Sequence, residues 1–201
     1  FRFIIGHWTK FSLWWLRVTC KINCVVDGEQ HLRHGPGVLL VTHQSTWEAL
    51  FIQTVVSPQT ILIKKELLWI PFFGWAFALL RPIAIDRTRR LGALRQLIDQ
   101  GSRRLDDGIW VTLFPEGTRL DSGNRAPMQR GGAALASASG KPVFVVAHNA
   151  GRCWPAHSFK KHGGTIQVRI STPISSVDRN ANEINRLAEE WLDRTMKEID
   201  A

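Results

Sequence analysis

Short apolar runs alternate with longer amphipathic stretches along most of the chain. The short runs predict strands at Val38–Thr42, Thr60–Lys64, Pro82–Asp86, Ile109–Phe114, Pro142–Ala147 and Thr165–Ile170. Helical spacing predicts helices near Thr46–Val56, Glu66–Leu80, Arg89–Leu105 and Gln129–Ser139, a closing helix from Ile184 to Ile199, and loops at His31–Gly37 and Asp121–Pro127. This alternation predicts a single α/β domain with a mostly parallel or mixed central β-sheet flanked by helices.

The N-terminal segment combines apolar residues at helical spacing with basic residues. The apolar positions are Phe1, Ile4, Ile5, Trp8, Phe11, Trp14, Trp15 and Val18, and the charged positions are Arg2, Lys10, Arg17 and Lys21. A basic amphipathic helix that carries tryptophans is typical of a helix lying in the headgroup layer of a membrane. Near an anionic leaflet, each base contributes about 1 kcal/mol to binding. The alternative is an ordinary helix packed on the domain's own core.

A membrane-spanning segment is not expected. The longest strongly apolar run, Leu67 to Leu80, is interrupted by Pro71 and Gly74 and falls short of the ~18 residues needed to span a bilayer. We therefore expect residues 1–21 to form an amphipathic membrane-association helix and residues 22–201 to form the α/β domain. The sequence begins with Phe1 and shows no cleavage site of small residues, which is compatible with a trimmed chain whose upstream anchor is missing.

The charge balance narrows the choice of partner. The 201 residues include 26 Lys and Arg against 17 Asp and Glu, a formal net charge of +9. A basic chain favours an anionic partner: nucleic acid, a phospholipid surface or a phosphorylated substrate. The N-terminal pattern favours the phospholipid surface. Three cysteines cannot form a disulfide framework and indicate reduced thiols, so we expect the protein on the cytoplasmic face of a membrane.

Candidate chemistry begins at His43, directly after the strand predicted at 38–42. Open α/β sheets place functional groups at the carboxyl ends of their strands. Glu48 follows in the first turn of the next helix, where a carboxylate can accept the imidazole N–H, fix its tautomer and stabilise the imidazolium. Glu48 also completes a capping box with Ser45, in which it bonds only the backbone at the helix start. Spacing alone leaves both interpretations open.

A second candidate loop follows the strand predicted at 109–114. It runs from Phe114 to Arg119 and reads Phe-Pro-Glu-Gly-Thr-Arg. Gly117 allows backbone amides to approach a ligand closely, and Arg119 offers a planar guanidinium suited to bidentate phosphate binding. For this hexapeptide taken alone, a plain Pro–Gly turn with a surface arginine is the alternative.

Four segments in order resemble the motifs of the glycerolipid acyltransferase family, and within it the 1-acylglycerol-3-phosphate (lysophosphatidic acid) acyltransferases. They are His43–Glu48, Lys64–Arg87, Phe114–Arg119 and the Lys-Pro-Val-Phe-Val-Val stretch that starts at Lys141. The family's first motif usually ends in Asp, whereas this chain has Glu48. The extra methylene permits a His–carboxylate contact but alters its geometry.

The resemblance implies an enzyme that moves a fatty acyl group from an acyl thioester, acyl-CoA or acyl-carrier protein, to the free hydroxyl of 1-acylglycerol-3-phosphate. The product would be phosphatidic acid for phospholipid biosynthesis. His43 would act as general base and Glu48 would orient it, a form of catalysis worth about 10²–10⁴ in rate. By family position, the substrate-binding residues are Lys64, Arg87, Glu116, Gly117 and Arg119, with the three cations on the acceptor's phosphate. The resemblance implies no cofactor beyond the co-substrate.

Two other functions stay open at this stage. The first is acyl transfer to another lyso-lipid, such as a lyso-ornithine lipid, for which a phosphate clamp has little use. The second is a non-catalytic domain that binds anionic lipid or nucleic acid, which explains the charge but leaves His43 unused; we expect no nucleic acid partner. No metal is expected, because His148, Cys153, His157 and His162 match no standard zinc spacing.

Overall fold

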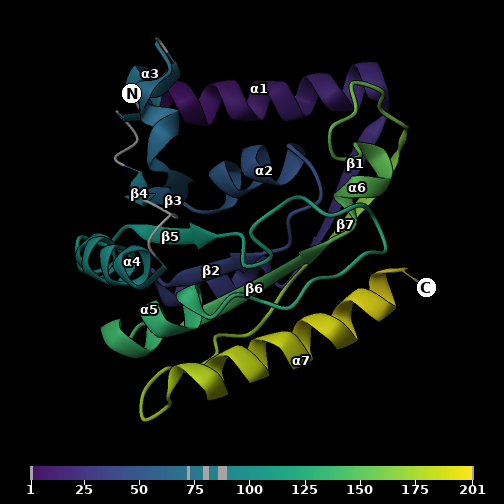
Figure 1. The fold of residues 1–201 in the computed structure, drawn as a ribbon. Helices are drawn as coiled ribbons and strands as arrows, with labels where there is room; N and C mark the ends of the chain where they lie inside the picture. Colours follow the sequence, from purple (N-terminus) through teal and green to yellow (C-terminus); the bar gives the residue numbers. More distant parts are fainter. Residues whose placement is uncertain (1, 72, 79–81, 86–89, 201) are drawn as a thin grey trace.

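The computed structural model describes residues 2–71, 73–78, 82–85 and 90–200 (Figure 1). The strands are β1 (Ile22–Asp27), β2 (Val38–Val41), β3 (Gln59–Lys64), β4 (Ile83–Ile85), β5 (Trp110–Leu113), β6 (Val143–His148) and β7 (Gly164–Ile170). The α-helices are α1 (Arg2–Cys20), α2 (Trp47–Val55), α3 (Phe73–Ala78), α4 (Arg90–Asp106), α5 (Gly131–Ser139), α6 (Ala150–Cys153) and α7 (Ala181–Asp200). Two 3-10 helices, η1 (Glu29–His34) and η2 (Lys65–Trp69), complete the described elements.

The strands form one mixed sheet in the order β1-β7-β6-β2-β5-β3-β4. Strands β6, β2, β5, β3 and β4 run parallel, β1 is parallel to β7, and β7 runs antiparallel to β6. Helices α1 and α2 cover one face of the sheet and α4, α5 and α7 cover the other (Figure 1). The predicted α/β architecture is therefore confirmed.

The central strand β2 shows why its sequence is apolar without alternation. Val38 and Leu40 point into the core shared with α4, α5 and α7, whereas Leu39 and Val41 point into the core on the α2 face. All four side chains are buried, with at most 1% of their surface exposed. A strand covered by helices on both faces has no polar side, so its sequence reads as a continuous apolar run.

Three local predictions were wrong. Strand β1 was missed, because it is an edge strand on which Asn23, Cys24 and Val25 are exposed and only Ile22 is buried. Part of the segment predicted as a loop at 31–37 forms η1. The single helix predicted at 66–80 is instead η2 followed by α3, with a turn at Pro71 between them; proline lacks the N–H that a continuous helix needs.

Helix α1 has two different faces. Thr9 and Leu16 are buried where the helix packs on α2, with 1% and 8% exposed. The tryptophan-bearing face is open, because Trp8, Phe11, Trp14 and Trp15 are 52–58% exposed. These four side chains therefore face away from the core, whereas Leu16 on the other face of the helix joins the core on the α2 side. The membrane contact of α1 stays a prediction. Within the described residues, none of the helices combines the length and hydropathy required to cross a bilayer.

Candidate active site

Three neighbouring parallel strands deliver the candidate residues to one edge of the sheet. Strands β2, β5 and β3 lie side by side, so their carboxyl ends meet at the same edge (Figure 1). His43 follows β2, the 114–119 loop follows β5, and Lys64 ends β3, where its backbone is in register with Ile85 of β4. Arg87 lies outside the described residues. The topology thus brings segments far apart in the sequence to a common site.

The pairing of His43 with Glu48 is present. The imidazole Nδ1–H donates to Glu48 Oε1 at 2.8 Å, which leaves the lone pair on Nε2. The same oxygen accepts the backbone N–H groups of Gln44 and Ser45 at 3.1 and 2.9 Å. Glu48 therefore serves the helix start and the imidazole at once, and the extra methylene relative to Asp does not prevent the contact.

The exposed fractions of the His43 and Glu48 side chains suit a catalytic base and the residue that supports it. The Glu48 side chain is completely buried, whereas 17% of the His43 side chain is exposed. A buried carboxylate keeps its negative charge only when it is well hydrogen-bonded, and Glu48 has three N–H donors. The imidazole can thus meet a substrate from the solvent side while its partner stays dry.

The 114–120 loop fixes the backbone and the ring of His43. The His43 N–H donates to Glu116 Oε2 at 2.6 Å, and the Leu120 N–H donates to the His43 carbonyl at 2.8 Å. The Phe114 ring stacks on the imidazole with centroids 4.1 Å apart. Gly117 forms the turn at a φ of 76°, a left-handed conformation that glycine adopts without strain and other residues rarely do. The loop and His43 therefore form one unit.

Arg119 carries an unused donor in this unit. It is half-buried and directly precedes Leu120, whose N–H holds the His43 carbonyl. Its Nε is buried and has no hydrogen-bond partner among the residues that the structure describes. A buried guanidinium N–H of this kind favours an anionic ligand, because leaving it unbonded is costly.

Glu116 is the one acid in the loop, and its environment disfavours its charge. Burial raises its pKa from 4.5 to about 7; the hydrogen bond from the His43 N–H opposes the rise, and the negative charge of Glu48 adds to it. Arg125 lowers the pKa of Glu116 slightly. This carboxyl therefore binds its proton at a much higher pH than a solvent-exposed glutamate does.

This raised pKa predicts that Glu116 makes stability depend on pH. The folded protein holds the Glu116 proton more tightly than the unfolded chain does. The resulting stabilisation is complete below pH 4.5 and is lost as pH rises through about 7. The loss amounts to at most about 3 kcal/mol. Urea denaturation at pH 5 and pH 8 should show a smaller pH effect in Glu116→Gln, and the exposed Glu66→Gln should behave as the wild type. An equal pH effect in all three proteins contradicts the assignment.

A cavity of about 590 Å³ adjoins the loop on the side of α4. Phe114 lines this cavity as well as stacking on His43. The apolar part of its lining comes from Leu62, Ile85, Ala93, Leu94, Leu97, Leu113 and Met128. An open pocket next to the base whose walls are largely apolar has the character of a site for a hydrocarbon chain.

The four residues that were weighed as metal ligands do not come together. His148 is fully buried at the end of β6, where its nitrogens bond Thr42 and Ala150 backbone atoms. The described part of the chain contains no group of three His, Cys, Asp or Glu side chains placed to hold a metal ion. Sequence reasoning missed the contact of Glu116 with His43 and the burial of His148, because both depend on packing between distant strands.

A histidine–carboxylate pair at a strand end, tied to a loop that carries a buried guanidinium N–H, combines a possible base with a group suited to binding an anion. Residues 23–149 match the family model described as Acyltransferase, and the chain belongs to this family. The resemblance drawn from the motifs is therefore confirmed.

Individual relatives sharpen the comparison. The chain is 45% identical to the 1-acyl-sn-glycerol-3-phosphate acyltransferase of Pseudomonas aeruginosa, over 99% of this chain and 79% of that protein. It is 29% identical to the Escherichia coli protein of the same name, over 88% and 70% of the two chains. The fold matches the crystal structure of the LPA acyltransferase PlsC from Thermotoga maritima, with a TM-score of 0.82, 24% identity and coverage of 100% and 80%.

Proposed function

We propose that this protein transfers a fatty acyl group from an acyl thioester to the free hydroxyl of 1-acylglycerol-3-phosphate and so produces phosphatidic acid. The observation that carries the proposal is the 2.8 Å contact of His43 with Glu48 beside a loop whose arginine has an unbonded N–H. The names of the Pseudomonas aeruginosa and Escherichia coli relatives support the same reaction.

The chemistry follows from the tautomer of His43. Its Nε2 takes the proton from the acceptor hydroxyl while Glu48 stabilises the imidazolium that forms. The acceptor oxygen then attacks the thioester carbonyl. As the tetrahedral intermediate collapses, the C–S bond breaks, and the thiol leaves with the proton that His43 returns. The thioester is already activated, so the reaction needs no covalent acyl-enzyme and no cofactor.

The decisive assay offers lysophosphatidate together with an isotopically labelled acyl thioester. Labelled phosphatidate and one free thiol for each acyl group transferred are expected. Running the assay in parallel with acyl-CoA and acyl-carrier protein identifies the donor. Transfer to a lyso-ornithine lipid but not to lysophosphatidate favours the second reaction considered above. Binding of anionic lipid without any thiol release favours a non-catalytic domain.

Arg119 is proposed to hold the phosphate of the acceptor, together with Lys64 and Arg87 by their family positions. Its buried Nε has no partner in the described structure, and a guanidinium can bind a phosphate through two parallel N–H···O bonds. We predict that Arg119→Ala raises the KM for lysophosphatidate about 10–100-fold, the cost of a charge-assisted bond, and leaves the donor KM nearly unchanged. Steady-state kinetics with each substrate varied in turn measure both constants.

The control for this prediction is an arginine of the same charge away from the site. Arg95→Ala, on the exposed side of α4, should leave both KM values near those of the wild type. If Arg119→Ala raises the two KM values equally, Arg119 does not act on the acceptor's phosphate.

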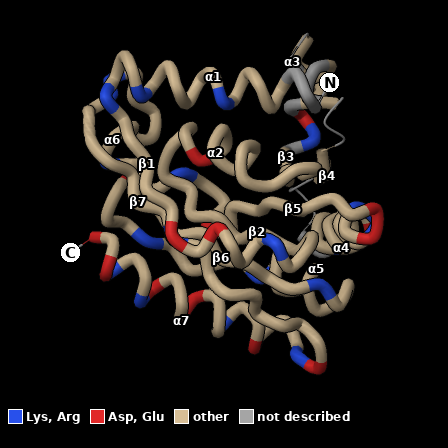
Figure 2. Tube along the Cα trace, turned by 180° about the vertical axis from the view of Figure 1, so that it is seen from behind, with Lys and Arg blue, Asp and Glu red and all other residues tan. Residues whose placement is uncertain are grey.

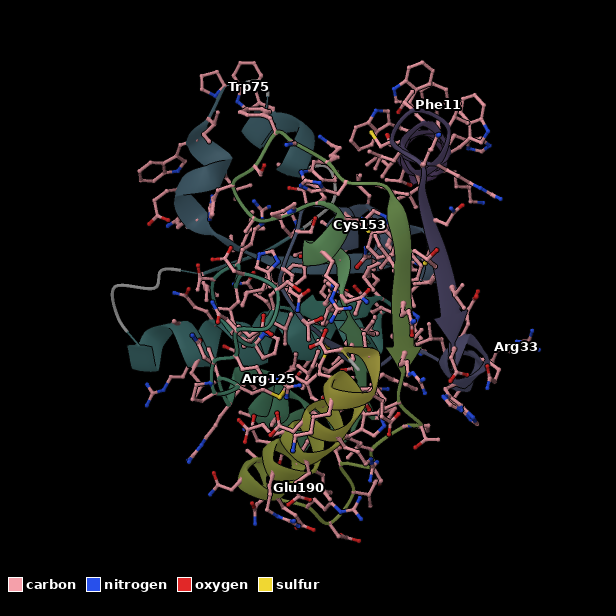
Figure 3. All side chains as sticks on the ribbon, turned by 90° about the vertical axis from the view of Figure 1, so that its right-hand side faces the viewer. Phe11, Arg33, Trp75, Arg125, Cys153 and Glu190 are labelled. Atoms are coloured by element: carbon pink, nitrogen blue, oxygen red, sulfur yellow. The ribbon has the colours of Figure 1, made fainter. Side chains whose placement is uncertain are left out.

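The exposed face of α1 is proposed to bind the cytoplasmic surface of an anionic membrane. Phe11 of α1 and Trp75 of α3 extend from the same end of the molecule (Figure 3). Other large apolar side chains exposed on α1, η2 and the two loops near them are Trp8, Trp14, Trp15, Val18, Trp69, Ile70 and Phe159. Basic positions and no acids occur along α1, whereas α7 at the opposite end carries both acids and bases, with the acids in excess (Figure 2). With its bases and exposed aromatic side chains, the α1 end of the molecule is suited to the surface of an anionic bilayer.

Vesicle binding tests this surface. We predict that the double substitution Trp8→Gln and Trp15→Gln lowers the partition coefficient onto phosphatidylglycerol-containing vesicles at least 10-fold, because two interfacial anchors are lost. Co-sedimentation measures the partition. Val177→Gln, at an exposed apolar position before α7, is the matched control and should bind as the wild type does. If the double variant binds as well as the wild type, α1 is not the membrane contact.

A further inference from the structure

His148 is a buried histidine that the proposed reaction does not use. It ends β6, the strand that pairs with β2 on the side away from β5. None of its surface is exposed. Its Nε2–H donates to the carbonyl of Thr42 at 2.9 Å, and its Nδ1 accepts the N–H of Ala150 at 3.2 Å. Both nitrogens are therefore occupied, and the ring has one defined tautomer.

The Nε2 edge of this ring faces the carboxylate that supports His43. The Glu48 Oε2 atom is buried and has no hydrogen-bond partner in the described structure, in contrast to Oε1 with its three donors. His148 Nε2 lies 4.0 Å from that oxygen. The Thr42 carbonyl that it holds belongs to the residue immediately before His43. The His148 Nε2–H therefore holds the backbone that leads into His43 and also lies beside the unbonded oxygen of Glu48.

We propose that His148 is a positioning residue for acyl transfer, which fixes the backbone entering His43 and places the positive edge of a neutral imidazole beside the unbonded oxygen of Glu48. The inference rests on the proposed function only for its kinetic consequence. Its electrostatic consequence concerns the His43–Glu48 pair itself and holds whatever the substrate is.

The ring is suited to this role because it stays neutral. Burial lowers the pKa of His148, and the nearby negative charge of Glu48 opposes that fall. A neutral ring adds the field of an N–H dipole without adding a second titrating charge to the pair. The other titratable groups that bear on the pair are Glu116, which holds the His43 N–H, and Arg125 next to Glu116.

The sign of the effect follows from electrostatics. Removing a positive edge from beside the pair favours an additional proton on it, whichever of the two residues carries that proton. The midpoint at which the pair takes up its proton should therefore move to higher pH. At pH values near the midpoint, fewer molecules then have a free base and kcat falls.

Two amide substitutions at His148 distinguish the effect of its Nε2–H donor from the effect of the packing of its ring. His148→Gln places an amide NH₂ near the position of Nε2, whereas His148→Asn reaches only the position of Nδ1. In His148→Asn we expect the proton-uptake midpoint of His43, followed by NMR on histidine-labelled protein, to rise by ~0.5 pH unit or more. A shift of ~0.5 pH unit lowers the fraction of free base by up to about 3-fold. kcat at neutral pH should fall by up to that factor with KM little changed, and His148→Gln should recover most of both properties. Phe144→Leu, elsewhere on β6, is the control for lost packing: it should lower Tm without moving the midpoint.

The outcomes are distinct. An unmoved midpoint in His148→Asn overturns the proposal. Equal losses in His148→Asn and His148→Gln that follow Tm alone also overturn it, because they show a purely structural role. If the wild type fails to acylate lysophosphatidate, the proposed function fails. The NMR titration still decides the positioning role of His148 in that case.

Discussion

Replacing His43 by alanine is expected to reduce acyl transfer by about 10²–10⁴-fold, because the acceptor hydroxyl loses the base that removes its proton. The imidazole is the group at this strand end whose Nε2 lone pair is left free by the bond from Nδ1 to Glu48. The reduction should appear in kcat, since the ring acts in the transition state and does not hold the acceptor's phosphate. Thiol release and labelled phosphatidate measure it together.

A matched control tests whether the loss of activity arises from removing any histidine side chain or from unfolding. His34→Ala removes an exposed imidazole from η1 and should retain activity near that of the wild type. Circular dichroism of His43→Ala should keep the helix and strand content of the wild type. If His43→Ala releases thiol at a rate near that of the wild type, His43 is not the base.

Glu48→Gln is expected to have the second largest effect, a fall in kcat of about 10²-fold or more. An amide keeps the size of the side chain and one acceptor oxygen for the helix-start N–H groups. It loses the negative charge that stabilises the imidazolium. Because one oxygen accepts the Nδ1–H and both backbone N–H groups, the amide oxygen that stays there keeps the tautomer of His43, and the loss of kcat reports the missing charge. Steady-state kcat measures the catalytic effect of the substitution, and the free energy of unfolding, obtained by urea denaturation, measures its effect on stability.

Ser45→Ala distinguishes the catalytic role of Glu48 from its role at the helix start. The Ser45 hydroxyl accepts the Trp47 N–H at 3.2 Å, so its removal perturbs the start of α2 while the Glu48 charge stays. A loss of about 1 kcal/mol in stability is expected for this variant, with kcat well above that of Glu48→Gln. Comparable losses of kcat in the two variants would indicate that Glu48 serves the helix alone.

The buried centre of the fold was predictable from the sequence, and its edges were not. Strands such as β2 and β6 are covered on both faces, so their apolar runs are long and unambiguous. Strand β1 pairs only with β7 and keeps exposed polar positions, so it lacks that pattern. In the 66–80 segment, apolar residues occur on every side, which concealed the break that Pro71 imposes.

The candidate site likewise has one contact that the sequence predicts and one that it does not. The contact of His43 with Glu48 is local and follows from a strand end and the first turn of a helix. The contact of Glu116 with the His43 N–H joins residues 73 positions apart, and no spacing rule reveals it. Sequence left the helix cap and the catalytic pair as alternatives, because it could not show that one carboxylate oxygen accepts three N–H groups.

The parallel arrangement of β2, β5 and β3 has a consequence for how such enzymes diversify. The base and its carboxylate come from the end of β2, whereas the groups proposed to recognise the headgroup come from the loop after β5 and from the end of β3. Substitutions at the end of β3 can therefore retune the choice of lipid without touching His43, whereas substitutions in the loop after β5 also affect His43, because that loop holds its backbone and its ring. Substrate preference can therefore change independently of catalytic power at the end of β3, but the two properties are inherited together in the loop after β5.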